Sequence, residues 1–316
     1  MQPQPDIQPR DPVTASQLHL AAMRKHDRAS VLRHRGGAEW NDTPDWRFER
    51  QVIRIGLFLR ERAAFFAGER IAIVSPLRIE LAVAEQAALA MGAASVALDP
   101  GLSDAQLALA LAQTAPKAIF VADGTVLGRL GDAARLVVCF DRPFPAEQAT
   151  LWTEALDLGG TLDTPERAQS FRAQAREVRP EMPALGFFAH PGNGSAGCEF
   201  ISHSELMARI RDTWASLPPR KGDVAYLAGG PATLGARIAL QACLGDGFTT
   251  TALGTPGREL EEIAELHPKR IVAPPAVLEA AQRNAPSPPQ RAPVRRGLVK
   301  RIAALWRREA RSIRGA

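Results

Sequence analysis

The residues best suited to chemistry lie in one glycine-rich segment, HPGNGSAG, which occupies residues 190–197 between two short apolar runs. Glycines let a backbone turn sharply and point several N–H groups at one anion, which is how loops cradle phosphate. The candidate contacts all have short side chains or none: Gly192, Asn193, Gly194, Ser195 and Gly197. We therefore predict a nucleotide or phosphate loop, with a glycine-rich turn that holds no ligand as the alternative.

Other common catalytic and binding motifs are absent from the sequence. There is no GxxxxGK[ST] loop, and the first expected strand-to-helix turn, SPLRIE, lacks the glycines of a dinucleotide site. Ser75 and Ser195 lack the GxSxG setting of a hydrolase nucleophile. His190 and His203 are thirteen residues apart, which fits no metal-ligand pattern. We accordingly predict no catalytic nucleophile and no metal site.

The elements that must position the loop follow from periodicity. A helix is expected from about Thr14, a hairpin that turns at Gly36-Gly37, and a helix opened by Thr43-Pro44-Asp45. From residue 70 onward, apolar runs alternate with helical patterns: RIAIVS, SVAL, AIFVA and LVVCF, then, after a polar stretch at 161–179, ALGFFA, EFIS, VAYLA, FTTTAL and RIVA. This alternation predicts an α/β fold with largely parallel sheets, covering helices and two similar βα subdomains, at about 70–140 and 184–284.

Composition places these elements in one globular body with two appendages. The chain has 316 residues, of which 46% are hydrophobic and 23% charged, close to the globular average. Residues 1–13 are polar and proline-rich, so we expect disorder there and no signal peptide. The body is expected over 14–284, and a stiff proline-rich linker over 285–293. The three cysteines, Cys139, Cys198 and Cys243, are expected to be reduced.

The segment 294–316 predicts a basic amphipathic helix. It holds eight basic residues and one acid, so +7 of charge lies there while the whole chain carries +5. Its candidate contacts with an anionic membrane surface or a partner are Arg301, Trp306, Arg307, Arg308 and Arg311. Because the remainder is slightly acidic, nucleic acid is not expected as a partner. We expect a cytoplasmic protein, with the inner membrane face as its alternative location.

Taken in order, these segments resemble the N-terminal domain of the AMP-forming adenylating ligases, the family of acyl-CoA synthetases, luciferases and peptide-synthetase adenylation domains. The resemblance covers about residues 40–284: RIAIVSPLRIELAVAEQAALAMGAASVALDPGLSDAQL matches the family's opening. ALGFFAHPGNGSAGCEFISHSEL falls at its phosphate loop, and DVAYLAGGPATLGARIALQACLGDGFTTTAL and IAELHPKRIVAPPAVLEAA match the next two units. The resemblance implies that fold, with ATP or AMP and an acyl group as ligands.

The sequence departs from the family at the groups that do its chemistry. The family loop runs Thr-Ser-Gly-Thr-Thr-Gly-x-Pro-Lys-Gly, and aligned without gaps back from Ser202-His203 its lysine falls on Gly197 while Gly194 is retained. No lysine lies between Lys117 and Lys221. The aromatic-Gly-x-Thr-Glu motif is missing, since Tyr226 precedes a leucine, and so is the Thr-Gly-Asp ribose motif. The sequence also ends where a full enzyme continues into its small C-terminal domain.

These departures predict a truncated, degenerate ligase-like protein. Adenylation needs metal and cationic groups around the α-phosphate, and several are lost together. The expected function is a non-catalytic nucleotide- or acyl-binding pseudoenzyme, or one half of a split ligase. An active acid–thiol ligase completed by a partner chain is one alternative, and a scaffold at the membrane surface is the other.

Overall fold

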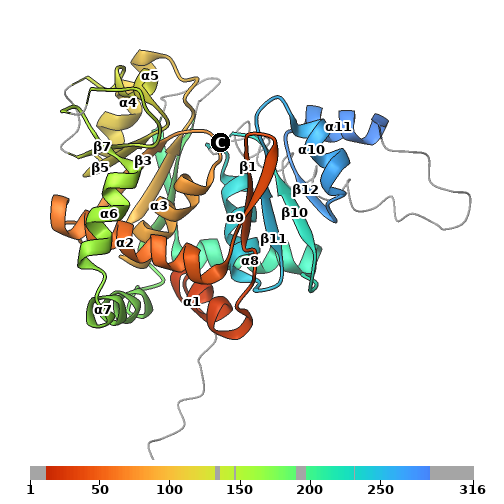
Figure 1. Ribbon diagram of the computed structural model, residues 1–316, viewed down its shortest axis with the longest axis horizontal. Helices are drawn as coiled ribbons and strands as arrows, with labels where there is room; N and C mark the ends of the chain where they lie inside the picture. Colours follow the sequence, from red (N-terminus) through yellow and green to blue (C-terminus); the bar gives the residue numbers. More distant parts are fainter. Residues whose placement is uncertain (1–11, 132–135, 146, 190–196, 231, 285–316) are drawn as a thin grey trace, which may run out of the picture.

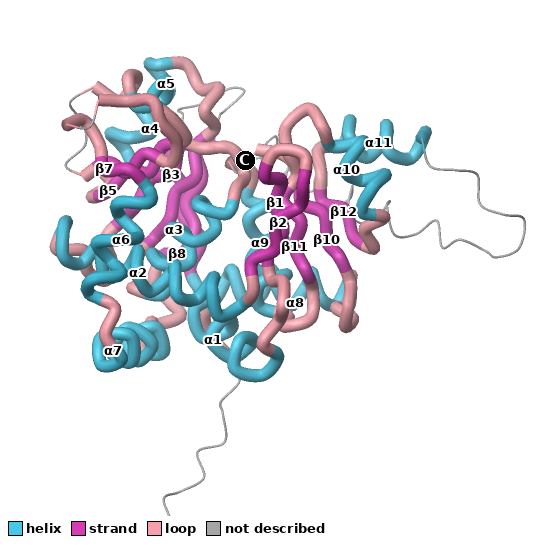
Figure 2. Tube along the Cα trace, viewed as in Figure 1, coloured by secondary structure: helices cyan, strands magenta, loops and turns pink. Residues whose placement is uncertain are grey.

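The computed structural model describes residues 12–131, 136–145, 147–189, 197–230 and 232–284, and within them the strands form two sheets that lie side by side (Figures 1 and 2). The predicted α/β fold with mostly parallel sheets and covering helices is confirmed. In the described helices, no segment is long and apolar enough to cross a membrane.

The larger sheet has seven strands in the order β7-β6-β5-β3-β4-β8-β9. Neighbouring strands are parallel except for β8 and β9, which form an antiparallel pair. The strands are β3 (Arg70–Val74), β4 (Ala94–Leu98), β5 (Ala118–Val121), β6 (Val137–Cys139), β7 (Thr150–Leu151), β8 (Pro183–Ala189) and β9 (Gly197–Ser202). The associated helices are α2 (Asp45–Ala63), α3 (Ile79–Ala90), α4 (Asp104–Thr114), α5 (Gly124–Leu127), α6 (Trp152–Leu162) and α7 (Pro165–Arg176).

Both faces of this sheet are buried, as its uninterrupted apolar strands require. Along β3, Ile71 and Ile73 pack with α2 and α3, whereas Ala72 and Val74 pack with α4 and α5 on the opposite face. A glycine allows α6 to lie directly against α2, because a Cβ at Gly159 would collide with the backbone carbonyl of Arg54. The core on the α2–α3 face continues into the second sheet through Leu227, Leu240 and Leu253.

The smaller sheet has five strands in the order β12-β10-β11-β1-β2. They are β1 (Leu32–Gly36), β2 (Glu39–Thr43), β10 (Val224–Leu227), β11 (Thr250–Leu253) and β12 (Arg270–Val272). The remaining helices are α1 (Ala15–His26), α8 (His203–Ser216), α9 (Leu234–Gly245), α10 (Glu259–Leu266) and α11 (Pro275–Asn284). The predicted hairpin, β1 and β2, completes this sheet because β1 pairs in parallel with β11, and the paired residues Leu32 and Thr251 are 219 positions apart.

One expectation about organisation needs correction. The run that starts at residue 184 does not belong wholly to the second unit, because β8 pairs with β4 and thereby joins the first sheet together with β9. The polar stretch at 161–179 contains the end of α6 and all of α7, which Thr164 caps by accepting a hydrogen bond from Arg167 N–H. The predicted disorder at 1–13 and the linker and basic helix beyond residue 284 lie almost wholly outside the described residues.

Candidate functional site

The two strands that carry the predicted phosphate loop, β8 and β9, form an antiparallel pair whose register shifts once, between Pro183 and Leu185. Ala189, the last residue of β8, is opposite Gly197, the first residue of β9. Gly192, Asn193, Gly194 and Ser195 lie outside the described residues, so their role in a loop remains a prediction. The structure therefore fixes where the loop leaves and re-enters the sheet, which is the edge where the parallel strands have their carboxyl ends.

An acidic residue, Asp99, lies at the same edge. It follows β4, and because Ala97 pairs with Phe187 in the parallel register, Asp99 is level with the end of β8. Its Oδ1 accepts a hydrogen bond of 2.7 Å from the backbone N–H of Gly101. Its Oδ2 faces Gly230, which follows β10 in the second unit, at 3.5 Å from where a Cβ would lie. The carboxyl ends of the two sheets thus meet here, the usual position of ligands in open α/β sheets.

The arginines near this edge are already paired. Arg78, which follows β3, contacts Asp141 at 2.6 Å and Glu80 at 2.7 Å. Arg129 contacts Asp104 at 2.7 Å and donates to the carbonyl of Pro100. Pairing with the two carboxylates raises the pKa of Arg78, although burial opposes this. These cations are therefore neutralised locally rather than presented to a bound phosphate.

Behind the edge, a fully buried ion pair joins the two units. Arg237 on α9 contacts Glu85 on α3 at 2.5 Å, and both side chains are 0% exposed. The same guanidinium donates to the carbonyls of Ser95 in β4 and Gly186 in β8. Gln241 donates to the second oxygen of Glu85. Because Gly186 is three residues from the end of β8, this network fixes the strand that leads into the loop.

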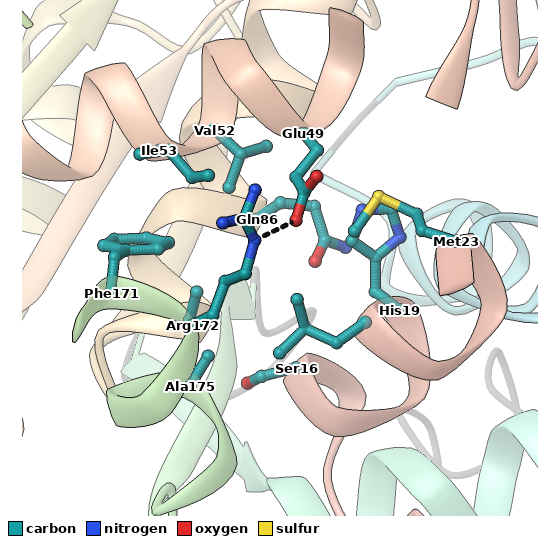
Figure 3. A pocket seen from close by; sticks show the side chains of 12 residues that line it. Ser16, His19, Met23, Glu49, Val52, Ile53, Gln86, Phe171, Arg172 and Ala175 are labelled. Atoms are coloured by element: carbon teal, nitrogen blue, oxygen red, sulfur yellow. Dashed lines mark hydrogen bonds and ion pairs between the residues drawn. The ribbon is translucent and has the colours of Figure 1, made fainter. Parts of the chain in front are cut away.

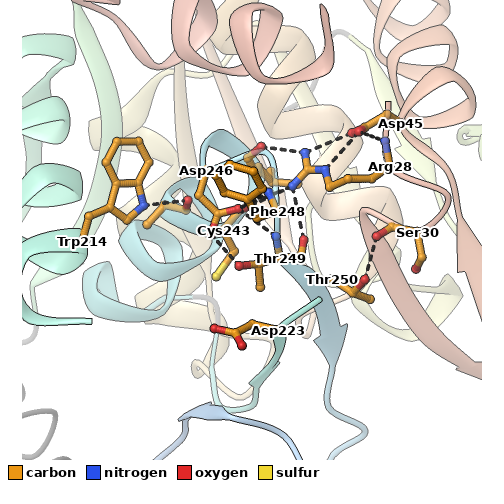
Figure 4. A network of polar contacts seen from close by, with 12 residues as sticks. Arg28, Ser30, Asp45, Trp214, Asp223, Cys243, Asp246, Phe248, Thr249 and Thr250 are labelled. Carbon is orange, nitrogen blue, oxygen red and sulfur yellow. Dashed lines mark hydrogen bonds and ion pairs between the residues drawn. The ribbon is translucent and has the colours of Figure 1, made fainter. Parts of the chain in front are cut away.

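A second buried network surrounds Arg28 (Figure 4). Its guanidinium forms a two-pronged contact with Asp45, the first residue of α2, and donates to the carbonyls of Cys243, Leu244 and Thr249. Asp246 in turn accepts from the backbone N–H groups of Phe248 and Thr249. This network attaches the segment before β1 to α2 and to the turn between α9 and β11. We call the Arg237 and Arg28 networks together the seam.

The single tyrosine is structural. Tyr226 is 0% exposed in β10, and its hydroxyl donates to Glu262 at 2.7 Å. Burial, followed by this carboxylate, raises the pKa of Tyr226. Glu262 also accepts from the backbone N–H of Thr255 after β11. Tyr226 therefore holds α10 against the smaller sheet and is not exposed for stacking on a nucleobase.

The histidines of the described region do not form a metal site. His203 is the first residue of α8 and is fully buried, which lowers its pKa to about 4. No group of three or more histidine, cysteine or acidic side chains positioned for a metal occurs among the described residues. All three cysteines are free; Cys139 and Cys243 are buried and Cys198 is half-buried. His190, Arg301, Trp306, Arg307, Arg308 and Arg311 lie outside the described residues.

A small enclosed cavity lies between α1, α2, α3 and α7 (Figure 3). Its volume is about 20 Å³, enough for one water molecule. An ion pair between Arg172 and Glu49, 2.7 Å long, lies on one side and His19 on the other. Burial, with a smaller effect of Arg28, lowers the pKa of His19 to about 4, so the imidazole is neutral at pH 7. The cavity is too small for a substrate.

Sequence reasoning missed the residues that connect the units. Glu85 and Arg237 are 152 positions apart, and neither belongs to a recognisable motif. The only signal was their position inside otherwise apolar helices, where a buried charge needs a partner. Asp99 could have been proposed as a site residue, because a polar residue directly after a buried parallel strand points to the functional edge of the sheet.

Comparisons with known proteins agree with this fold. A family model described as AMP-binding enzyme matches residues 46–305. That range extends past Asn284 into the residues interpreted as linker and tail. No curated protein sequence matches the chain.

Solved structures share the fold at low identity. Acetoacetyl-CoA synthetase from Streptomyces lividans superposes with a TM-score of 0.70 at 14% identity over 85% of this chain and 44% of that one. A luciferase-like enzyme from the Zophobas morio mealworm gives 0.71 at 15% identity over 91% and 64%. The A domain of carboxylic acid reductase from Segniliparus rugosus, in complex with AMP and a co-purified carboxylic acid, gives 0.61 at 15% identity over 82% and 48%. The chain thus spans less than two thirds of each of these proteins.

Proposed function

The chain belongs to the AMP-binding enzyme family, and from that premise we propose that it binds a nucleotide or an acyl ligand without catalysing adenylation by itself. The proposal concerns the 316 residues of this sequence. The proposal distinguishes two properties that the family combines. One is holding a phosphate in a backbone loop, and the other is stabilising the charge that develops while the phosphate is transferred.

The observation that carries the proposal is the residue at the lysine position of the loop. Gly197 occupies that position and is the first residue of β9, paired with Ala189. Adenylation requires a cation near the α-phosphate, and each group lost from such a site costs on the order of 3 kcal/mol of transition-state stabilisation. The ion pairs of Arg78 and Arg129 also support the proposal, because each of these arginines is already paired with a carboxylate.

Binding a phosphate needs fewer protein groups than catalysing its transfer. Backbone N–H groups in a glycine turn hold phosphate without a side-chain charge, and Gly194 keeps the family's glycine at that position. One structural neighbour was solved with AMP and a carboxylic acid, which supports these two ligand classes. We expect weak binding of AMP, with Asp99 at the same edge opposing a fully charged phosphate.

The test is a titration together with an activity assay. Calorimetry with AMP, ATP and an acyl-AMP analogue should detect saturable binding, while carboxylate-dependent release of pyrophosphate from ATP should not exceed a heat-killed control. Turnover clearly above that control would overturn the non-catalytic assignment. Absence of binding at millimolar nucleotide would overturn the nucleotide-binding assignment.

Three variants sharpen the test. Gly194→Val should abolish AMP binding by blocking close approach of the phosphate. Gly197→Lys restores the family's cation and should strengthen AMP binding about tenfold, equivalent to about 1.4 kcal/mol. Ala38→Val adds bulk in the exposed β1–β2 turn and is the matched control that should change nothing. Equal affinities for all four proteins would place the nucleotide elsewhere.

A second candidate is one half of a split ligase. The observation that favours it is coverage, because the chain spans 44% of the acetoacetyl-CoA synthetase and 48% of the reductase A domain that it superposes on. In this case a partner chain supplies the magnesium, ribose and lysine motifs. Pyrophosphate release should then appear only when this chain and a polypeptide carrying those motifs are mixed, and no turnover from the mixture would contradict it.

The basic segment supports a third role, attachment to an anionic membrane surface. Residues 294–316 carry +7, and each basic residue near such a surface contributes about 1 kcal/mol. Co-sedimentation should require anionic vesicles and should fall when Arg307, Arg308 and Arg311 are replaced by glutamine. Equal sedimentation with neutral and anionic vesicles would contradict this role.

A further inference from the structure

A groove beside the β1–β2 hairpin has features that the nucleotide loop does not explain. It lies between the hairpin, the start of α3, and helices α2 and α6, and its volume is about 310 Å³, within the range of small-molecule sites. We call it the hairpin groove and define it by six of the residues that line it: His34, Arg47, Gln51, Glu80, Val83 and Trp152. A neighbouring groove of about 350 Å³ shares His34 and Glu80 with it.

Two polar atoms in the hairpin groove are buried without a hydrogen-bond partner among the described residues. They are Nδ1 of His34, from β1, and Oε1 of Gln51, from α2. An unpaired buried polar atom costs about 1–3 kcal/mol, so a ligand that pairs with these two atoms would recover that cost. Gln51 Oε1 can only accept, which requires a hydrogen-bond donor on the ligand.

The charges in the hairpin groove favour a single negative group. Glu80 is paired with Arg78 at 2.7 Å, and Asp42, which also lines the groove, is paired with Arg33 at 2.7 Å. Arg47 is exposed, and its guanidinium forms no hydrogen bond or ion pair with the described residues. Glu80 shares Arg78 with Asp141, so Arg47 is the charged lining side chain that has no oppositely charged partner within the described part of the chain.

The local electrostatics of His34 and α3 point the same way. Burial is the main cause that lowers the pKa of His34; Arg78 and Arg47 add to it, and Glu80 and Asp42 oppose it. The imidazole therefore remains a neutral hydrogen-bonding group at pH 7. The first turn of α3 lines the groove through Ile79 and Glu80, and the residue before it, Arg78, provides no side-chain cap.

The apolar part of the lining consists of Ile79, Val83 and Trp152. Val83 is fully buried, and Trp152 is only 6% exposed although it lines the groove. Trp152 is itself held by Phe120 and Phe140 through edge-on ring contacts, with centroid distances of 6.4 and 5.3 Å. A rigid aromatic surface of this kind suits a flat or ring-sized apolar group.

We propose that the hairpin groove binds a small organic acid that carries a hydroxyl or amino donor beside its carboxylate and an apolar, ring-sized body. The carboxylate lies at Arg47 and the start of α3, the donor at Gln51, and the ring against Trp152. This site is separate from the nucleotide loop. The loop follows β8 and α3 follows β3, two strands away in the sheet, a separation of about 10 Å.

The test uses three matched probes. 3-Phenyllactate has the carboxylate, the hydroxyl and the ring; 3-phenylpropionate lacks the hydroxyl; and 3-phenyllactamide lacks the negative charge. Calorimetric titration of the full chain at pH 7.5 should show saturable binding of 3-phenyllactate, with both analogues weaker by at least about tenfold. No saturation by 3-phenyllactate, or equal binding of the three probes, would overturn the proposal.

Variants then locate the site. Arg47→Gln and Gln51→Leu should each weaken 3-phenyllactate binding at least tenfold, while Arg50→Gln, on the same helix but paired with Asp163, should leave it unchanged. Because Arg47 is exposed, its replacement should not affect folding, which circular dichroism verifies. Gly194→Val should lose AMP but keep 3-phenyllactate, so the two sites fail independently. Loss of 3-phenyllactate in Gly194→Val, or its retention in Arg47→Gln, would reject the assignment.

Discussion

Arginines occur both at the seam and around the hairpin groove, but in opposite states. At the seam, Arg237 and Arg28 are 0% and 8% exposed, and each guanidinium contacts several carbonyls as well as a carboxylate. In the hairpin groove, Arg47 is exposed and unpaired among the described residues, beside an imidazole with an unpartnered nitrogen. A polar network whose hydrogen-bonding groups are all paired stabilises the fold, whereas polar groups without a partner remain able to bind a ligand.

The largest effect should come from breaking the seam at Arg237. Arg237→Leu leaves Glu85 buried without its countercharge, which should destabilise the protein by about 3–5 kcal/mol. Urea denaturation measures this loss. The double variant Arg237→Leu/Glu85→Leu should recover part of it, because the uncompensated charge is gone. A single variant as stable as the parent would show that the two units do not depend on this pair.

Replacement of Arg28 by lysine should have a smaller effect, of about 2–3 kcal/mol. The charge is kept, but an ammonium cannot reproduce the fork that contacts Asp45 together with the carbonyls of Leu244 and Cys243. Some of these buried carbonyls would lose their donor, at about 1–3 kcal/mol each. Urea denaturation again provides the measurement. An unchanged midpoint would mean that charge alone holds this part of the seam.

Acid should destabilise the protein through two buried histidines. His19 and His203 each have a folded-state pKa of about 4 against an ordinary value of 6.5. The unfolded chain therefore binds more protons than the folded one, so stability falls as pH drops from about 6.5 towards 4. Each histidine should contribute a loss of about 2 kcal/mol between pH 7 and pH 5.

The measurement is urea denaturation at several pH values. His19→Gln should flatten the dependence by one histidine's share, while the exposed His267→Asn should leave it as in the parent. A parent protein equally stable at pH 7 and pH 5 would contradict the buried, neutral state of both imidazoles.

Local features of the fold could be read from the sequence, and long-range ones could not. Thr14 caps α1 and Thr43-Pro44-Asp45 opens α2, because such signals depend only on neighbouring residues. Thr164-Pro165-Glu166 is the same kind of signal, and it marks the start of α7 inside the polar stretch at 161–179. An apolar run does not reveal which strand it will pair with, so β8 and β9 were placed in the wrong unit.

The candidate site residues show the same difference between local and long-range features. The glycine segment was visible because its residues are adjacent in the sequence, and its anchoring strands are found where the pattern placed them. His34 and Gln51, by contrast, come from a strand and a helix and were invisible as a pair. Their unsatisfied atoms become apparent only when the packing around them is known, since each residue alone is an ordinary polar side chain.

The smallest expected effect on stability concerns Arg47, in the hairpin groove. Arg47→Gln should change the free energy of unfolding by no more than about 0.5 kcal/mol, because an exposed side chain without an ion pair contributes little to stability. Arg78→Gln, on the neighbouring wall, should cost more, since it removes partners from both Glu80 and Asp141. Urea denaturation of both variants, beside the 3-phenyllactate titration, separates the two roles. If Arg47→Gln destabilised the protein as much as Arg78→Gln, then Arg47 would belong to the architecture and the contrast between the seam and the hairpin groove would fail. If instead it lowers affinity and leaves stability unchanged, the free charge serves a ligand rather than the fold.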